Sequence, residues 1–234
     1  RQAKALVGRG LLGKVRKVVA EYDLGWLAAP NAGKQAVWRI DPKQSGVSAC
    51  VGDIGTHAEH LIEFVTGLRI TDLCADLSTF VEGRTLDDDA SILLRFDNGA
   101  RGLISVSEVA TGEENQFRLR IYGEKGSIEW RQQQPEDLVF RSNDKAMRVY
   151  RRGWAEMEKG VAETTRLPAG HPEGFLEAFA NLYKDFALAV DARLSGKTPR
   201  PGFPSVEAGV RGMAFVEAVV RNAASARKWT KLPQ

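Results

Sequence analysis

The sequence is poor in cysteine, and it has neither a cysteine motif nor a long apolar run. Its two cysteines, Cys50 and Cys74, show neither a CxxC spacing nor the density of a disulfide framework. A reducing compartment, and hence a cytoplasmic location, is therefore the simpler interpretation, and metal ligation by cysteine is not expected. No stretch approaches the roughly 18 consecutive apolar residues of a membrane helix, and no signal-peptide pattern opens the chain. We expect no membrane partner.

A concentrated excess of one charge is also absent. The 33 basic and 30 acidic residues are dispersed along the chain, and the resulting net charge of +3 does not form a basic face. The only notable basic cluster, Arg148 with Arg151 and Arg152, is explained by a solvated strand edge. Nucleic-acid binding needs a denser basic surface, so we expect no nucleic-acid partner.

The first half of the chain predicts a short helix, a strand, a long loop and a second helix. Residues 1–10 place Ala3, Leu6 and Val7 on one helical side, and glycines follow. The alternation over 15–22 predicts a strand, and the stretch from about 23 to 50 is rich in Gly, Pro, Asn and Ala. Loops of that length are usually functional in compact domains.

Residues 70–151 predict a large antiparallel sheet. Apolar and polar residues alternate, and the Asp97-Asn98-Gly99 segment is a strong hairpin signal between strands at 90–96 and 101–109. Further strands are expected at residues 117–122, 128–130, 137–141 and 147–150. Two helices should follow, one after His171-Pro172 and one over about 205–224, with apolar stripes packed on one face of the sheet. The expected fold class is therefore α+β.

Asp53 and His57 are the strongest candidates for chemistry. On a helix, positions i and i+4 are neighbours about 5–6 Å apart at Cβ, close enough to act on one substrate hydroxyl. His57 could then be a general acid/base, with Asp53 orienting it or the substrate. Alternatively, Asp53 is only a helix N-cap and His57 a half-buried polar residue. A metal triad with His60 fits the spacing but lacks a supporting carboxylate cluster, so no metal is expected.

Four further residues are weaker candidates for a binding site. Trp38 and Arg39, in the long loop that also holds Trp26, could stack on and hydrogen-bond a sugar-like ligand, or Trp38 could simply anchor the loop. Asn115 precedes a strand and could be a turn residue or a polar contact. His171 stands before a predicted helix, where a side chain can be presented, although a helix-entry turn also explains it.

Taken together, five segments in order resemble the C-terminal half of the Gfo/Idh/MocA family of NAD(P)-dependent sugar and polyol oxidoreductases. These are the opening helix with its Leu-Gly turn, Gly52-Asp-Ile-Gly-Thr-His57, and residues 88–99, 121–130 and 170–175. The second segment is similar to the family's Asp-x-x-x-His catalytic motif. The resemblance implies a C-terminal domain like those of dihydrodipicolinate reductase and glyceraldehyde-phosphate dehydrogenase, with helices on one face of the sheet.

The resemblance also implies a mechanism and partners. His57 would be the general acid/base, Asp53 would position the reacting hydroxyl, and Trp38, Arg39, Asn115 and His171 would be walls of the substrate pocket. Hydride would pass between NAD or NADP and a sugar, inositol or related polyol, and the protein would be a homodimer or homotetramer joined through the sheet face.

The departure from the family is at the start of the chain. The sequence has no Gly-rich dinucleotide loop or Glu-Lys-Pro segment, begins with Arg1, and has only three methionines. We therefore expect residues 1–14 to be a remnant helix leaving a Rossmann domain, residues 15–234 to be the substrate and oligomerisation domain, and this fragment alone to be inactive. The alternative is a non-catalytic module that assembles through its sheet.

Overall fold

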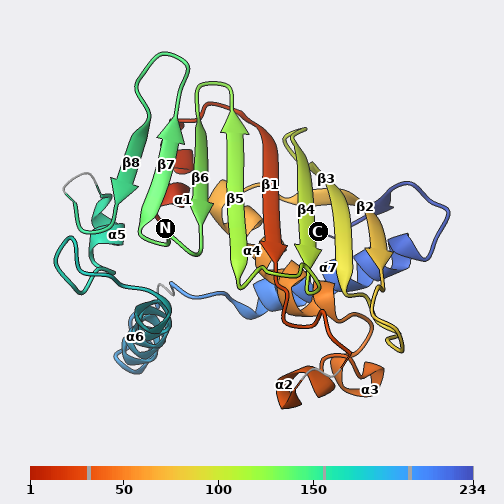
Figure 1. The fold of residues 1–234 in the computed structure, drawn as a ribbon. Helices are drawn as coiled ribbons and strands as arrows, with labels where there is room; N and C mark the ends of the chain where they lie inside the picture. The colour runs from red at the N-terminus through yellow and green to blue at the C-terminus, as the bar shows by residue number, and fades with distance from the viewer. Residues whose placement is uncertain (31–32, 155–156, 200–201, 234) are drawn as a thin grey trace.

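The computed structural model describes residues 1–30, 33–154, 157–199 and 202–233 and is built around one nine-stranded sheet (Figure 1). The strands lie in the order β8-β7-β6-β5-β1-β4-β3-β2-β9. Their bounds are β1 Val15–Asp23, β2 Ile70–Ser78, β3 Asp89–Phe96, β4 Arg101–Ser107, β5 Gln116–Gly123, β6 Ser127–Arg131, β7 Asp137–Arg141, β8 Arg148–Arg151 and β9 Thr230–Lys231. In the described segments, no helix is long and apolar enough to cross a membrane.

The sheet consists of two antiparallel meanders that meet at β1. Strands β5 to β8 form one meander and β2 to β4 the other, while β1 pairs antiparallel with β5 and parallel with β4. The predicted hairpin at 97–99 joins β3 and β4, and Gly99 supplies the positive φ of 87° that the turn needs. The expected strands are confirmed, whereas the two-residue β9 was not predicted.

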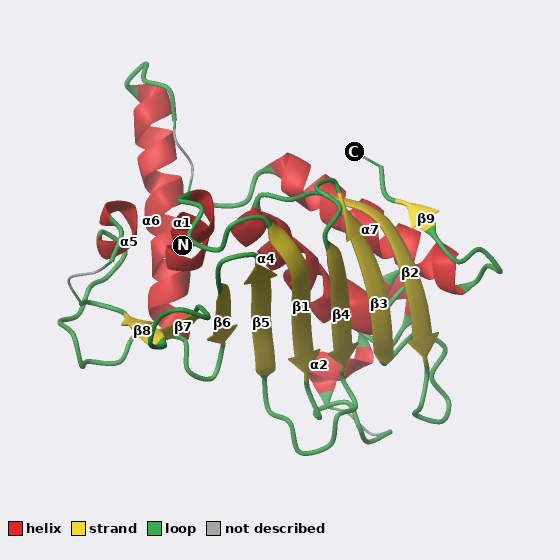
Figure 2. Ribbon diagram, turned by 90° about the horizontal axis from the view of Figure 1, so that it is seen from above, coloured by secondary structure: helices red, strands yellow, loops and turns green. Residues whose placement is uncertain are grey.

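Helices cover one face of this sheet, which confirms the predicted α+β class. The helices are α1 Gln2–Gly8, α2 Lys34–Val37, α3 Pro42–Ser45, the π-helix η1 Val51–Gly55, α4 Thr56–Thr66, α5 Lys159–Ala162, α6 Phe175–Leu194 and α7 Val206–Ala223. Seen from above, α1, α4 and α7 lie on the same side of the strands (Figure 2). Leu6, Ile62 and Phe215 from these helices join Val18 and Ile104 from the sheet in one buried core.

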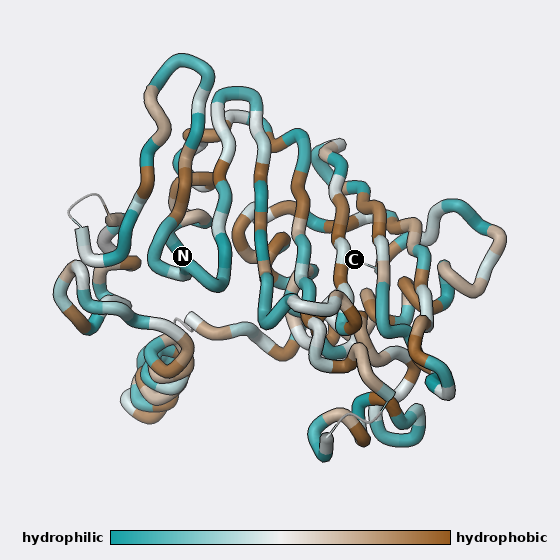
Figure 3. Tube along the Cα trace, viewed as in Figure 1, coloured by the Kyte–Doolittle hydropathy of each residue, from teal (hydrophilic) through white to brown (hydrophobic). Residues whose placement is uncertain are grey.

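The alternation of side chains along the strands explains why only one face is covered. In β1, Val18, Ala20 and Tyr22 belong to the core, whereas Lys17 and Glu21 point to the other face. The hydropathy of the trace alternates in the same way along the neighbouring strands (Figure 3). This period of two is the pattern expected of an antiparallel sheet with one buried face.

A network of buried ions joins α7 to α4. Arg211 on α7 donates from Nη2 to Glu63 Oε1 at 2.6 Å and to the Ile70 carbonyl at 2.8 Å. Glu59, one turn before Glu63, is 2% exposed, and burial raises the pKa of its carboxyl to about 7. The covering helices are thus held by polar contacts as well as by the core.

The prediction that α6 packs on the sheet is wrong. Its stripe of apolar residues is exposed, with Phe175 75% and Tyr183 72% accessible, and none of its side chains is buried. Helical periodicity identified the helix correctly, but periodicity alone does not say which surface an apolar stripe contacts. In Figure 1 α6 lies clear of the strands.

Two smaller expectations are also corrected. The apolar residues at helical spacing in α7 are Val206, Val210, Met213, Ala214, Val216 and Val220. Val216 is buried and Ala214 packs on the core, as expected, whereas Val206, Val210 and Met213 are exposed. Phe215 and Val219 complete the buried side. The first turns of α7 extend beyond the core, so their apolar residues are left outside it. The expected loop over 23–50 contains the one-turn helices α2 and α3.

We predict that Gly123→Ala destabilises the fold. A Cβ at this position would lie 2.1 Å from the backbone oxygen of Leu12, in a turn held by the Lys125 amide donating to that same carbonyl at 2.8 Å. Since backbone rather than a flexible side chain must move, the free energy of unfolding should fall by about 3 kcal/mol in urea titration. Gly209→Ala, in an open helical position, is the control and should not destabilise. Equal stability of both variants would contradict the close approach.

Candidate functional site

Asp53 and His57 lie where a π-helical turn runs directly into α4. The turn, η1, spans Val51–Gly55, and Gly55 is required there because a Cβ would lie 2.9 Å from Val51 Cγ1. The core side of η1 and α4 buries Ile54, Ala58, Ile62 and Val65. Asp53 keeps 27% of its side chain exposed and His57 is exposed. Single π-turns inside helices occur frequently at functional sites.

In the structure Asp53 is not the N-cap of α4. Gly55 is the residue before α4, no side chain caps that helix, and Asp53 lies inside η1. The capping role belongs instead to Asp87, a residue that the sequence analysis missed. Its buried carboxylate accepts hydrogen bonds from Ser48 Oγ at 2.9 Å and from the amides of Ala49 at 3.1 Å and Val51 at 2.9 Å.

Asp53 is paired with Arg39, whose guanidinium lies over two tryptophan rings. Arg39 Nε donates to Asp53 Oδ2 at 2.7 Å. The guanidinium carbon lies 4.2 Å from the ring centroid of Trp38 and 5.3 Å from that of Trp26. These are cation–π distances, so the two rings restrict where the guanidinium can go. The structure thereby unites three predicted site residues, Trp38, Arg39 and Asp53, and adds Trp26.

His57 stands beside a second aromatic pair. Its ring centroid is 6.2 Å from that of Tyr22, which stacks on Phe117 at 4.6 Å with an angle of 4°. Burial raises the pKa of the Tyr22 hydroxyl, and the charge of Asp53 acts in the same direction. Tyr22 was missed as a site residue because in the sequence it is one more apolar position of a strand.

Asn115 and His171 make no recorded contact with Asp53 or His57 among the described residues. Asn115 is exposed in the bend before β5, and its carbonyl accepts from the Phe117 amide at 3.1 Å. Since Phe117 stacks on Tyr22, Asn115 lies at the same sheet edge as the site. Its role in binding stays a prediction.

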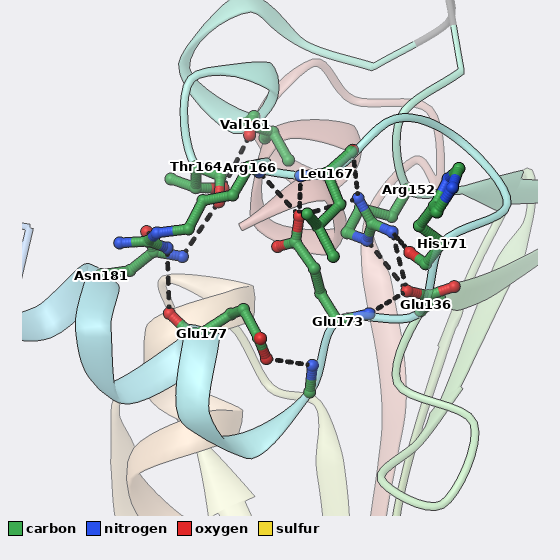
Figure 4. Close-up of polar contacts among 11 residues, drawn as sticks. Glu136, Arg152, Val161, Thr164, Arg166, Leu167, His171, Glu173, Glu177 and Asn181 are labelled. Atoms are coloured by element: carbon green, nitrogen blue, oxygen red, sulfur yellow. Dashed lines mark hydrogen bonds and ion pairs between the residues drawn. The ribbon is translucent and has the colours of Figure 1, made fainter.

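His171 belongs to a separate polar cluster between the β7–β8 hairpin and α6 (Figure 4). Its carbonyl accepts from Arg152, whose guanidinium also binds Glu136 Oε1 at 2.9 Å and Glu173 Oε1 at 3.0 Å. Glu173 in turn accepts hydrogen bonds from the backbone amides of Arg166 and Leu167. This cluster fixes the loop that presents His171, while a substrate contact of His171 stays a prediction.

A metal site does not emerge from the described residues. No group of three or more His, Cys, Asp or Glu side chains within them is arranged to hold an ion. His60, the third member of the possible triad, is directed along its own helix toward Phe64, with ring centroids 6.0 Å apart. Burial lowers the pKa of the His60 ring.

A wide hollow at the ends of β1, β3 and β4 is lined by residues other than the site candidates described above. Asp23, Asp89, Ser107 and Glu113 are among its lining residues, and none of Trp38, Asp53 or His57 is. Burial, with the charges of neighbouring carboxylates, raises the pKa of Asp23 to about 6. The candidate catalytic groups therefore do not lie in this acidic hollow.

Comparison with known proteins gives a consistent family assignment. A sequence model of the GFO/IDH/MocA C-terminal domain matches residues 1–129. An uncharacterized oxidoreductase of Bacillus subtilis is 31% identical over 238 residues, covering 98% of this chain and 61% of the relative. A structure of an inositol dehydrogenase homolog from Azotobacter vinelandii, complexed with NAD+, superposes with a TM-score of 0.93 at 34% identity over 98% of this chain and 61% of that one.

A further solved relative is a levoglucosan dehydrogenase, in complex with NADH and L-sorbose. It superposes with a TM-score of 0.84 at 25% identity, over 100% of this chain and 62% of that chain. The curated levoglucosan dehydrogenase is that of Pseudarthrobacter phenanthrenivorans. The chain thus spans about three fifths of the length of the relatives it matches.

We predict that Asp87→Ala loosens the turn that carries Asp53. Removing a buried carboxylate that serves three donors leaves those donors without an acceptor, which should lower the free energy of unfolding by about 3 kcal/mol. Hydrogen exchange of the Ala49 and Val51 amides should accelerate. The control is Asp191→Ala, an exposed aspartate on α6. Unchanged protection of both amides would show that Asp87 does not hold η1.

Proposed function

This chain belongs to the GFO/IDH/MocA family, and we propose that it supplies the substrate side of an NAD(P)-dependent oxidoreductase acting on a sugar, inositol or related polyol. His57 is the proposed general acid/base, and Asp53 orients the reacting hydroxyl. The observation that carries the proposal is the pairing of Asp53 with Arg39, which lies over two tryptophan rings, four residues before an exposed histidine.

The chemistry requires a proton and a hydride to leave the same carbinol group. In the family's reaction the nicotinamide, when bound, exchanges the hydride with the substrate carbon. The proton must then be taken from the substrate oxygen by a group within hydrogen-bond reach, and a neutral imidazole is suited to this near neutral pH. The exposed His57 ring can reach a ligand from solvent, whereas the neighbouring Tyr22 is buried.

Asp53 would hold the hydroxyl in the orientation that this proton transfer needs. Arg39 binds one carboxylate oxygen, Oδ2, so that the other can accept from a substrate hydroxyl. Trp26 and Trp38 each keep about two fifths of their surface exposed, at 40% and 41%. Aromatic surface combined with a few directed polar groups is typical of small-molecule sites.

Most of the cofactor site is proposed to lie outside this chain. The sequence contains no glycine-rich dinucleotide loop, so we propose that a Rossmann domain in the full-length protein provides most of the NAD or NADP site and that this chain alone is inactive. Structures of relatives contain NAD+ or NADH, which supports a nicotinamide cofactor. The two free cysteines support a cytoplasmic location for the enzyme.

The test replaces the proposed acid/base in the full-length protein. His57→Ala should lower kcat by about 10²-fold or more in assays with NAD+ or NADP+ and a panel containing myo-inositol, levoglucosan and hexoses. His60→Ala, on the same helix, is the matched control and should retain most of the turnover. Near-normal turnover of His57→Ala would refute the assignment.

A second proposal concerns assembly through the uncovered face of the sheet. Cys74, Leu93, Leu103 and Val19 lie opposite one another on four adjacent strands, and none belongs to the core under the helices. Leu93 is 47% exposed. An apolar row on an otherwise charged sheet face supports a homodimer or homotetramer as the partner arrangement.

This assembly is tested by light scattering. Wild-type protein is expected to have at least twice the monomer mass, and Leu93→Lys should shift the population toward monomer because a charge would be placed inside the interface. Val47→Lys, an exposed position outside the sheet, should leave the mass unchanged. A monomeric wild type would reject assembly through this face without bearing on His57.

A further inference from the structure

Helix α6 carries an apolar stripe that lies outside the core formed by the described residues. Its members recur every three or four residues, so they share one side of the helix. All of them are exposed, with between 38% and 82% of their surface accessible: Phe175, Leu176, Phe179, Leu182, Tyr183, Phe186, Val190 and Leu194. A continuous apolar surface of this kind marks a place where another surface packs.

The polar side chains that hold α6 to the rest of the chain lie on its other side. Arg166 Nη1 donates to Asn181 Oδ1 at 2.6 Å, and Asn181 Nδ2 donates to the Thr164 carbonyl at 3.0 Å (Figure 4). Asp185, one turn further on, pairs with the guanidinium of Arg1. At 3.6 residues per turn, Asn181 and Asp185 face away from the stripe. These contacts therefore hold the helix with its apolar side directed outward.

Residue 1 lies against the same helix. Besides pairing with Asp185, Arg1 donates from Nη2 to the Gly202 carbonyl at 3.2 Å, in the connection between α6 and α7. The next residue, Gln2, accepts from the Glu158 amide at 3.0 Å, just before α5. A segment joined to residue 1 would therefore leave the described fold beside α6.

The length of the relatives indicates what kind of surface covers the stripe. The chain spans 61% of the Bacillus subtilis oxidoreductase and 61% of the inositol dehydrogenase homolog, and the proposed function adds a Rossmann domain to the full-length protein. Helix α6 has 20 residues, so at about 1.5 Å per residue it is about as long as a small domain is wide. Helices form the outer layers of a Rossmann sheet, and an apolar stripe packs into the groove between such helices.

We propose that the apolar stripe of α6 is the docking surface of the cofactor domain that precedes residue 1 in the full-length protein. This inference rests on the proposed function, which requires such a domain. Helix α6 then belongs to the contact between domains rather than to the layer on the sheet, which explains why none of its side chains joins the core. Since Asn181 and Asp185 fix α6 to the chain, the docking sets where the cofactor domain stands relative to His57.

Hydroxyl-radical footprinting with mass spectrometry tests the docking by comparing the full-length protein with the 234-residue chain. Phe175, Tyr183 and Phe186 should be oxidised several-fold more slowly in the full-length protein, because their rings are covered there. Met147, 59% exposed in the connection between β7 and β8, is the control and should react at the same rate in both proteins. Equal rates for the three rings would overturn the proposal.

A second copy of this chain is the competing occupant of the stripe, and the same measurement distinguishes it. A second copy would already protect the three rings in the 234-residue chain. That protection would disappear on dilution, together with a fall in the mass measured by light scattering. This result would overturn the proposal in favour of self-association through α6.

A substitution in the stripe gives a test that does not depend on footprinting. Tyr183→Lys places a charge in the proposed contact, so the Tm of the full-length protein should fall by about 5 °C or more. The Tm of the 234-residue chain should not change, because Tyr183 is 72% exposed there. Asp191→Lys introduces the same side chain at an exposed position outside the stripe and should alter neither Tm. A fall of equal size in both proteins, or in neither, would reject the docking.

These outcomes are separable from the catalytic assignment. If His57→Ala proves fully active, the proposed acid/base fails while protection of the stripe stands. If the stripe stays reactive in a full-length protein whose His57→Ala variant has lost turnover, this inference fails alone.

Discussion

The carboxylate of Asp87 is the constraint on which the candidate site depends. The first amides of a helix have no acceptor within it, and here the buried Asp87 side chain accepts from the amides of Ala49 and Val51 and from Ser48 Oγ. Ser48 Oγ in turn accepts from the Gly52 amide at 3.1 Å. Asp87 and Ser48 thus hold the start of η1. Asp53, inside η1, binds Arg39, and His57 lies in the first turn of the regular helix α4. The position of the proposed catalytic groups thus depends on Asp87, which is not one of them.

The charged groups of the site are held by their neighbours. Asp53 is paired with the cation of Arg39. The cation is itself held by two indole rings. Each group therefore limits the orientation of the next, which is how a small number of side chains can be kept in a defined geometry.

Periodicity and turn chemistry predicted the sheet, the hairpin at 97–99 and the helix that carries His57, because those signals are local. The same local signals failed for α6 and for the first turns of α7, since an apolar stripe such as Phe175 to Phe186 is exposed here. In the site, Asp53 with Trp38 and Arg39 was predictable from one stretch of sequence. Tyr22 and Asp87 were not, because they reach the site from a distant strand and a distant loop that only the fold brings together.

The position of β1 at the junction of two meanders bears on how the chain folds. Each meander consists of strands joined by short connections, so its pairings form between residues close in sequence. Strand β1 has no such neighbour: its partners, β4 and β5, begin at residues 101 and 116, about a hundred residues further along the chain. Closing a loop of that length costs chain entropy before any contact compensates for it. The central strand of the finished sheet is therefore expected to be among the last to join it, and the rate of folding to depend on that late docking.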